Sequence, residues 1–331
     1  MTDNAPLPAR ELAWTGGFDQ HLRWGVDAAG GQAFWLRMQS AGRGVAAAQT
    51  MTVSLATFRR DSNRAILVQD SEVMPAAAKR AWRRGGDWAA LQYNWQSGSF
   101  LSADAGALRT RLFTARGQAS GRLQSLHAGA GAVLGWPLGG LDVRDAAWQG
   151  ELSTAGQQVE GGFEGATWQH WGRLVVPGQA MAHCRHFTDR PDAAFFGLGQ
   201  IVLPQGQRRE ALALGLGRLV VAGETILFDR WWPAPTVDAP RFDNYRWLAT
   251  MVNRDCRLEI SIDGGNPRLV PWLELDDLLP GGGSRLLRVT PFAAFRLRLF
   301  RRGRAEPLHD LRSPGGLLMM AVPGAIADAS A

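Results

Sequence analysis

The chain has 331 residues, of which 46% are hydrophobic and 20% are charged, with a net charge of +6 and an isoelectric point near 10.4. This composition excludes a disordered chain. No apolar run approaches the roughly 20 residues that a membrane-spanning helix needs, and the two cysteines are too far apart in the sequence to indicate a disulfide framework. Almost all the positive charge is arginine, with Lys79 the only lysine, and the arginines are scattered, which argues against nucleic acid as a partner.

The first predicted element is a hairpin near the start of the chain. Residues 18–26 alternate between apolar and polar side chains, as a half-buried strand does. One face carries Phe18, Leu22, Trp24 and Val26, and the other carries Asp19, His21 and Arg23. A glycine-containing turn at residues 27–31 and a return strand through Trp35 complete the hairpin.

Alternating apolar residues around short turns predict further strands along the chain. Hairpins are predicted at residues 88–102, 108–113, 148–161, 210–228 and 256–270, and strands at residues 286–289 and 295–301. One short helix is predicted at residues 74–82. A series of antiparallel hairpins with so little helix predicts an all-β fold of barrel or sandwich lobes rather than an alternating α/β fold.

The glycine-rich segment HAGAGAVLGWPLGG, residues 127–140, is the predicted seam between two lobes. Residues 1–136 are expected to form an N-terminal β lobe, and residues 141–331 a C-terminal β lobe. The start of the chain has no basic region followed by an apolar stretch, so a cytoplasmic protein with reduced thiols is expected.

The sequence lacks the motifs of common cofactor and nucleophile chemistries. It has no G-x-S-x-G elbow, no Walker loop, no H-E-x-x-H and no C-x-x-C. The segments GLG at residues 197–199 and 215–217 lack the third glycine of a dinucleotide loop. We interpret them as glycines within strands, where a neighbouring backbone or a ligand approaches closely. No cofactor is therefore expected.

The segment WQHWGRLVVPGQAMAHCRHF, residues 168–187, carries three histidines and a cysteine among aromatic residues. If residues 179–187 form a strand, Cys184 and His186 share one face and His183 lies on the other. His183 and His186 then cannot bind one metal, and Cys184 and His186 lie roughly 6 to 7 Å apart at Cα, too far for a nucleophile and its base. A metal site that uses His170 stays open, but zinc needs further converging ligands, so no metal is predicted.

Two interpretations of the aromatic and polar residues remain. Trp168, His170 and Trp171 either line a cavity or pack in the core, with their ring nitrogens bonded to backbone carbonyls. The polar face of residues 19–23 is either functional or the solvent side of an edge strand.

Three features together resemble the tocopherol cyclase-like and carotenoid 1,2-hydratase-like proteins. The stretch FDQHLRWGVDAAGGQAFWLRM resembles the first hairpin of this family. Residues 168–187 resemble the tryptophan-rich strand pair that opens its second half, with HWG at residues 170–172 and AHC at residues 182–184 as fixed points. The spacing between the two, with a break near Trp136, also fits. Where relatives tend to carry tryptophan before the AHC run, this chain has the less rigid Met181.

The resemblance implies two lipocalin-like β lobes with an apolar ligand bound in a lobe or between the lobes. The group includes cyclases and hydratases of isoprenoid chains that need no nucleotide or flavin, and other members are lipid carriers. The predicted function is accordingly a cofactor-independent cyclase, isomerase or hydratase that acts on an apolar isoprenoid or polyene molecule.

A dry aromatic cavity can fold such a substrate and stabilise developing positive charge, and a carboxyl group with a raised pKa can donate the proton that starts the reaction. Asp19 is the predicted acid, and His21 is expected to orient it or to act as a base. The predicted substrate-binding residues are Arg23, Trp24, Trp35, Trp168, His170, Trp171 and His183.

Two other classes of function stay open. A non-catalytic carrier of a lipid or pigment needs the same cavity as the enzyme. A carbohydrate-binding module would instead present its tryptophans on an exposed face. Peripheral contact with a membrane is also left open, and the sequence predicts no oligomeric state.

Overall fold

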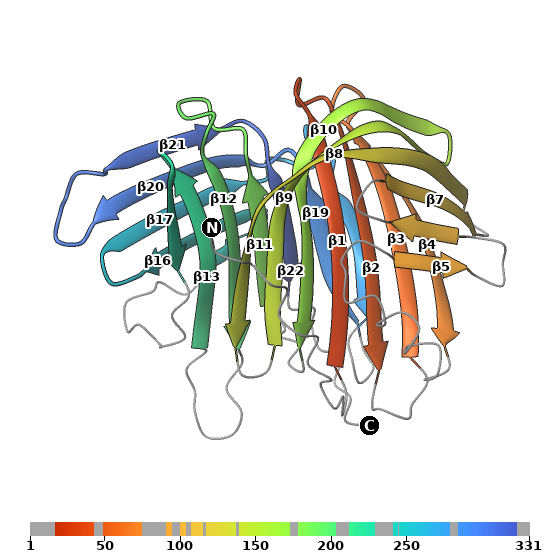
Figure 1. Ribbon diagram of the computed structural model, residues 1–331, viewed down its shortest axis with the longest axis horizontal. Coiled ribbons are helices and arrows are strands. Elements are labelled where there is room, and N and C mark those ends of the chain that lie inside the picture. Colours follow the sequence, from red (N-terminus) through yellow and green to blue (C-terminus); the bar gives the residue numbers. More distant parts are fainter. Residues whose placement is uncertain are drawn as a thin grey trace, which may run out of the picture.

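The fold consists of antiparallel β-sheets (Figure 1). The computed structural model describes residues 17–42, 49–74, 91–94, 100–103, 107–114, 117–136, 139–172, 178–202, 212–228, 241–243, 245–278 and 284–322. Every regular element within these ranges is a strand. The ranges contain no helix, and thus none that is long and apolar enough to cross a membrane. The predicted all-β class is confirmed.

The first sheet has ten strands in the order β4-β3-β2-β1-β10-β9-β8-β7-β6-β5. They are β1 (Gly17–Asp27), β2 (Gln32–Gly42), β3 (Gln49–Arg59), β4 (Arg64–Met74), β5 (Leu91–Asn94), β6 (Phe100–Ala103), β7 (Ala107–Thr114), β8 (Gly117–Trp136), β9 (Gly139–Thr154) and β10 (Gln157–Gly172). The sheet curls over on itself into a half-barrel. Thr57 on β3 hydrogen bonds with Thr154 at the end of β9, and the Gln157 amide of β10 donates to the Thr57 carbonyl (2.9 Å).

The rest of the described chain forms two more sheets. The second has the order β14-β13-β12-β11-β22-β19-β18, and the third has the order β15-β16-β17-β20-β21. The strands of the second sheet are β11 (Gly178–Cys184), β12 (Ala194–Val202), β13 (Leu212–Val221), β14 (Glu224–Phe228), β18 (Leu273–Leu278), β19 (Ser284–Thr290) and β22 (Leu317–Val322). Those of the third are β15 (Arg241–Asp243), β16 (Arg246–Val252), β17 (Cys256–Asp263), β20 (Ala294–Arg301) and β21 (His309–Ser313).

Three apolar cores hold these layers together. One fills the half-barrel of the first sheet, one lies between the first and second sheets, and one lies between the second and third sheets. The second sheet is therefore covered on both faces. This explains why β11 and β22 are apolar at nearly every position instead of alternating.

Most of the predicted hairpins are confirmed. The pairs β1–β2, β5–β6, β9–β10 and β13–β14 all form at the expected turns. Two predicted hairpins are wrong. Residues 108–113 form no hairpin, because they lie within the single strand β7. Residues 256–270 form none either, because β17 pairs with β16 and β20, and the chain then crosses to β18 in the second sheet. The helix predicted at residues 74–82 lies outside the described residues beyond Met74, which ends β4.

The predicted lobe boundary at residues 136–141 coincides with the turn between β8 and β9, inside the first sheet. The chain changes sheets later, between β10 and β11. The division into lobes at 136 and 141 stays a prediction.

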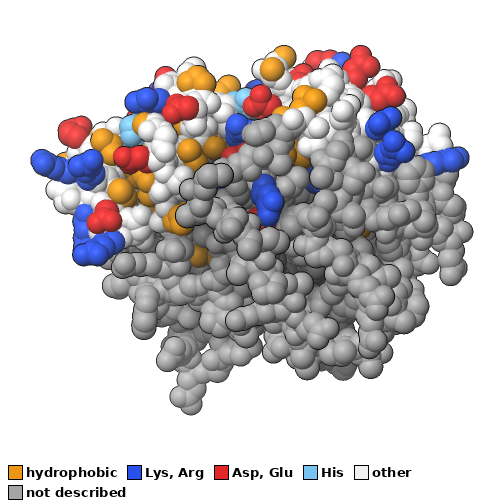
Figure 2. Space-filling model, viewed as in Figure 1, with side chains coloured by type: hydrophobic (Ala, Val, Ile, Leu, Met, Phe, Trp, Pro, Cys, Tyr) orange, Lys and Arg blue, Asp and Glu red, His pale blue; other side chains and the backbone are white. Residues whose placement is uncertain are grey.

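Several arginines on the outer face of the third sheet are paired with acids. Residues 295–299 alternate between buried apolar and exposed charged side chains, as predicted. On the outer face Arg296 pairs with Asp310, and Arg298 pairs with Glu259. Positive and negative side chains are likewise intermixed on the described surface visible in Figure 2. Arginine here covers a sheet rather than forming one continuous basic patch.

The GLG segments lie within β12 and β13, as predicted, and their glycines pair across these strands. The glycines of β12 make room for an aromatic ring. A Cβ atom at Gly199 would stand 2.9 Å from the Trp247 ring, and one at Gly197 would stand 3.0 Å from it. Trp247 of β16 therefore packs directly on the backbone of the second sheet.

Candidate functional site

The two faces of β1 separate the predicted site residues. Leu22 and Trp24 point into the core between the first and second sheets. By strand alternation His21 and Arg23 lie on the opposite face, which lines the half-barrel. The backbones of Asp19 and Trp171 pair between β1 and β10, but their side chains are outside the described part of the chain.

The other predicted residues meet between the first and second sheets. Trp24, Trp35 and Trp168 are fully buried there. His170 shares a face of β10 with Trp168 and is 2% exposed. His183 on β11 faces them from the second sheet, with its ring centroid 5.3 Å from that of Trp24 in an edge-on arrangement. The structure thus brings five of the nine predicted residues to one interface, while His21 and Arg23 lie elsewhere.

His183 belongs to a buried three-residue centre that links the two sheets. His183 Nε2 lies 2.9 Å from Asp145 Oδ1, and the Arg218 guanidinium donates to Asp145 Oδ2 at 3.0 Å. Asp145 comes from β9 of the first sheet, and Arg218 comes from β13 of the second. His183 is 0% exposed and the Arg218 and Asp145 side chains are 2% and 10% exposed. The centre is therefore screened from bulk water.

The charges within this centre define the state of the imidazole. Burial raises the pKa of Asp145, but the His183 hydrogen bond and the nearby positive charges outweigh burial and lower it to about 2. Burial lowers the pKa of His183 more than the Asp145 carboxylate raises it, and Arg218 already balances the charge of that carboxylate. His183 is thus neutral and Asp145 ionised near pH 7.

This charge state fixes the tautomer. An ionised carboxylate only accepts hydrogen bonds, so His183 Nε2 carries the proton and donates it. The other nitrogen, Nδ1, is then an unprotonated base, and it is buried without a hydrogen-bond partner. A histidine oriented by a carboxylate, with its second nitrogen bare, is the arrangement that general-base catalysis uses.

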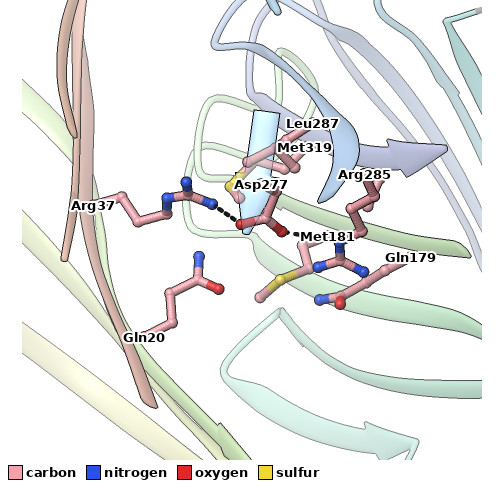
Figure 3. Close-up of a pocket in the computed structure, with 9 residues that line it drawn as sticks. Gln20, Arg37, Gln179, Met181, Asp277, Arg285, Leu287 and Met319 are labelled. Atoms are coloured by element: carbon pink, nitrogen blue, oxygen red, sulfur yellow. Dashed lines mark hydrogen bonds and ion pairs between the residues drawn. The ribbon is translucent and has the colours of Figure 1, made fainter. Parts of the chain in front are cut away.

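A second buried ion cluster lies beside a small pocket in the same interface (Figure 3). Arg37 of β2 donates to Asp277 Oδ1 at 2.7 Å, and Arg285 of β19 donates to Asp277 Oδ2 at 2.9 Å. Burial raises the pKa of Asp277, but the two guanidinium groups outweigh burial and lower it. The lining is completed by Gln20, Gln179, Met181, Leu287, Met319 and Ala321.

This pocket is much smaller than the predicted cavity. Its cavity volume is about 10 Å³, and its empty space is about 230 Å³ when the open mouth is counted. A water molecule or a small polar head group fits there, but a whole polyene does not. The expected large aromatic hollow is thus not what this pocket provides, because Trp24, Trp35 and Trp168 pack into the surrounding core.

The same three tryptophans leave hydrogen-bond donors unused. The Nε1 atoms of Trp24, Trp35 and Trp168 are buried without a partner. Buried donors in folded proteins are nearly always bonded to protein, water or ligand. A molecule with oxygen atoms between the first two sheets would therefore find donors ready on the first sheet.

Cys184 takes no part in this site. Its side chain packs in the core between the second and third sheets, and burial raises its pKa to about 12. It is therefore a neutral thiol, as the prediction against a cysteine nucleophile requires. No cluster of three or more His, Cys, Asp or Glu side chains suited to a metal occurs in the part of the chain that the structure describes.

A further acid lies inside the half-barrel, on the face of His21. Asp142 pairs with Gln169, which pairs in turn with His21, so these three residues form one row across β9, β10 and β1. Burial raises the pKa of Asp142 despite Arg144, 3.4 Å away, and Asp142 Oδ1 has no partner. This is the property that the sequence interpretation assigned to Asp19.

Sequence reasoning missed Asp145, Arg218, Arg37 and Asp277. For the two arginines a signal was present, because each is the one charged residue in an otherwise apolar strand segment, FWLRM at residues 34–38 and LGLGRLVV at residues 214–221. Long apolar strands rarely bury a charge without a partner. Asp145 and Asp277 gave no such signal, because each has another charged residue next to it in the sequence.

The fold is shared with three solved structures over nearly the whole chain. An AttH-like protein of Nitrosomonas europaea matches with a TM-score of 0.52 and 13% identity, over 96% of this chain and 98% of that chain. CghA matches with a TM-score of 0.57 and 12% identity, over 94% and 90%. Kievitone hydratase from Nectria haematococca matches with a TM-score of 0.52 and 9% identity, over 94% and 90%.

No protein-family model and no curated protein matches the sequence itself. At 9% to 13% identity, the structural matches establish the fold and nothing finer. The chain has the lipocalin-like, two-lobed β architecture of these proteins.

Proposed function

We propose that this protein is a cofactor-independent enzyme that cyclises, isomerises or hydrates an apolar isoprenoid or polyene molecule by proton transfer between its first and second sheets. The observation that carries the proposal is the bare Nδ1 atom of His183, held by the ionised Asp145. The shared fold with kievitone hydratase, whose name gives a hydration, and the resemblance to tocopherol cyclase-like and carotenoid hydratase-like proteins support the same class.

In the proposed mechanism His183 relays one proton. Nδ1 accepts it from an acidic carbon or hydroxyl group of the substrate, or from a water molecule whose oxygen bonds to the substrate, and the imidazolium then gives the proton to another atom of the substrate. Asp145 holds the ring and stabilises the imidazolium that forms in between. Trp24 and Trp168 are buried in the same core and keep bulk water away from the imidazole.

The packed interface must open to admit a substrate. Met181 and Met319 pair across β11 and β22 and lie between the pocket and the core. Methionine has the flexibility to repack around a ligand. The large core tryptophans are expected to keep their positions.

The test is turnover in heavy water. The protein is incubated in D2O with a panel of polyenes, polyprenyl phenols and kievitone, and mass spectrometry detects deuterium, added water or a new isomer. His183→Gln keeps an N–H donor toward Asp145 but removes the Nδ1 base, and a loss of at least about 100-fold in turnover is expected. His309→Gln, on β21 of the third sheet, serves as the matched control and should retain activity.

Asp19→Asn in the same assay separates the two candidate positions for the chemistry. Full activity of the His183→Gln variant, together with a loss in Asp19→Asn, would move catalysis from His183 to Asp19. Each result thus assigns the reaction to one of the two candidate residues.

A carrier function is the second candidate, favoured by the flexible Met181 and Met319 that line the pocket. It predicts that a bound molecule is recovered unchanged after incubation. Extraction with organic solvent before and after incubation compares the two candidates on one sample.

A further inference from the structure

The pocket between the first two sheets is built for a negative charge. Of the nine residues that line it, Arg37 and Arg285 are positive and Asp277 is the one acid. The side chains of Arg37 and Asp277 are 2% and 3% exposed, and that of Arg285 is 11% exposed. The lining thus carries one more positive than negative charge, which favours the approach of an additional anion.

Arg37 also offers a donor that the protein does not use. Its terminal nitrogen is engaged by Asp277, but its Nε atom is buried without a partner. A buried donor without a partner destabilises the protein, so a ligand acceptor at this position is favoured. The planar guanidinium matches a carboxylate better than a single hydroxyl oxygen.

Two amides complete the polar lining. Gln20 stands beside Arg37 on the side of the first sheet, and Gln179 stands beside Arg285 on the side of the second sheet (Figure 3). Both glutamines are buried, at 6% exposure each. Donors thus come from both sheets and converge on one small volume.

The rest of the lining is apolar and leads toward His183. Met181, Met319 and Ala321 line the pocket and also belong to the core between the sheets. Gln179, Met181 and His183 share one face of β11, and the first and last of these are four residues apart. At about 3.3 Å per residue, His183 lies roughly 13 Å along the strand from the polar end.

We propose that this pocket binds the carboxylate of an apolar acid, with the acid group at Arg37 and Arg285 and the hydrocarbon chain directed along β11 toward His183. The inference rests on the proposed function for the isoprenoid or polyene nature of the chain. It narrows the substrate class to molecules that carry a carboxylate about 13 Å from the reacting atoms.

Binding of matched retinoids tests this inference without any need for turnover. All-trans-retinoic acid, methyl retinoate and retinol share one polyene chain and differ at its head. Their dissociation constants are measured by quenching of tryptophan fluorescence. The acid is expected to bind about ten-fold more tightly than the ester or the alcohol, because only the acid pairs with the arginines.

The variants Arg37→Met and Arg285→Gln should each reduce the ratio of the ester's dissociation constant to the acid's to near one, while the affinity for the ester stays the same. Arg285→Gln is the less disruptive change, since the Arg285 side chain is more exposed than that of Arg37, and it decides the matter where Arg37→Met does not fold. Arg288→Gln is the matched control, because Arg288 pairs with Glu274 on the other face of β19. It should keep the preference.

Equal binding of acid and ester by the unaltered protein, no binding of the acid, or a preference that survives in Arg285→Gln would overturn the inference. Its failure is distinct from failure of the proposed function. An acid preference with recovery of unchanged ligand supports the pocket and rejects the enzyme. Turnover of an uncharged polyene without acid preference supports the enzyme and rejects the pocket.

Discussion

The two faces of the second sheet differ in chemistry although they belong to the same strands. The face toward the third sheet carries Ala180, Ala182 and Cys184 from β11, and glycines of β12 lie against Trp247. Trp247 Nε1 lacks a partner there, but none of the buried charged residues of the described chain lies on this face. It is a packing surface.

The face toward the first sheet carries charges from the same strands. His183 of β11, Arg218 of β13 and Asp277 of β18 all project from it, and each meets a residue of the first sheet. Burying ion pairs seldom adds stability compared with apolar packing. The charged face therefore fits the proposed binding role, since the third-sheet side shows that apolar packing alone can hold these strands together.

The largest stability effect is expected on the charged face. Arg218→Met removes the partner of Asp145 Oδ2 and leaves the carboxylate with His183 alone. The free energy of unfolding should fall by about 3 kcal/mol, the cost of breaking a buried pair. Urea denaturation measures this change.

The double variant Arg218→Met with Asp145→Leu should recover much of the lost stability, because no unpaired charge remains. A double variant less stable than Arg218→Met would show that the centre stabilises the fold by itself. It would then no longer count as a functional feature.

A smaller effect is expected on the packing face. In Gly199→Ala the new Cβ would stand 2.9 Å from the Trp247 ring, so the ring or the backbone must shift, at a cost of about 2 kcal/mol. Gly215 pairs with Gly199 across β12 and β13, and its Cβ would meet Met251 at an ordinary 3.5 Å. Gly215→Ala should therefore have a clearly smaller effect, and equal losses in the two variants would contradict the packing described here.

Lowering the pH should reduce stability through the charged face by about as much as Gly199→Ala does through the packing face. The pKa of Asp145 is about 2 in the folded protein against 3.8 in the unfolded chain, so its contribution is present above about pH 4 and is lost as the pH falls toward 2. The loss amounts to about 2 kcal/mol. The pKa of His183 is lowered from 6.5, so the unfolded chain takes up that proton first and stability also declines as the pH falls below about 6.5.

Asp145→Asn should flatten the acid part of this curve in thermal unfolding measured from pH 7 to pH 2. An unchanged curve would mean that Asp145 is not held in its ionised form by His183 and Arg218. The measurement needs no substrate.

Local patterns were enough to predict most of the fold. Alternation along residues 18–26 and 295–299 gave the right strands and faces, because a strand side chain has only two directions to choose from. On β11 it also placed Cys184 and His183 on opposite sides. The prediction at residues 256–270 failed because Asp263-Gly264-Gly265 looks like a hairpin turn, whereas Trp272 covers Gly264 and the chain continues into another sheet.

The candidate site was only partly predictable. Trp24, Trp168 and His183 stood out by residue type, but their meeting depends on two sheets that pack face to face. Arg37 and Asp277 are separated by 240 positions in the chain. No local pattern connects residues so far apart, so their pairing emerges only from the tertiary fold.

The central claim is that His183 is a neutral, buried base oriented by Asp145, and nitrogen-15 NMR of the imidazole rings tests it most directly. The chain has six histidines, and the His183→Gln variant assigns the signal by its loss. The account predicts a proton on Nε2 and a bare Nδ1 at pH 7. A doubly protonated ring, or a proton on Nδ1 instead of Nε2, would contradict it.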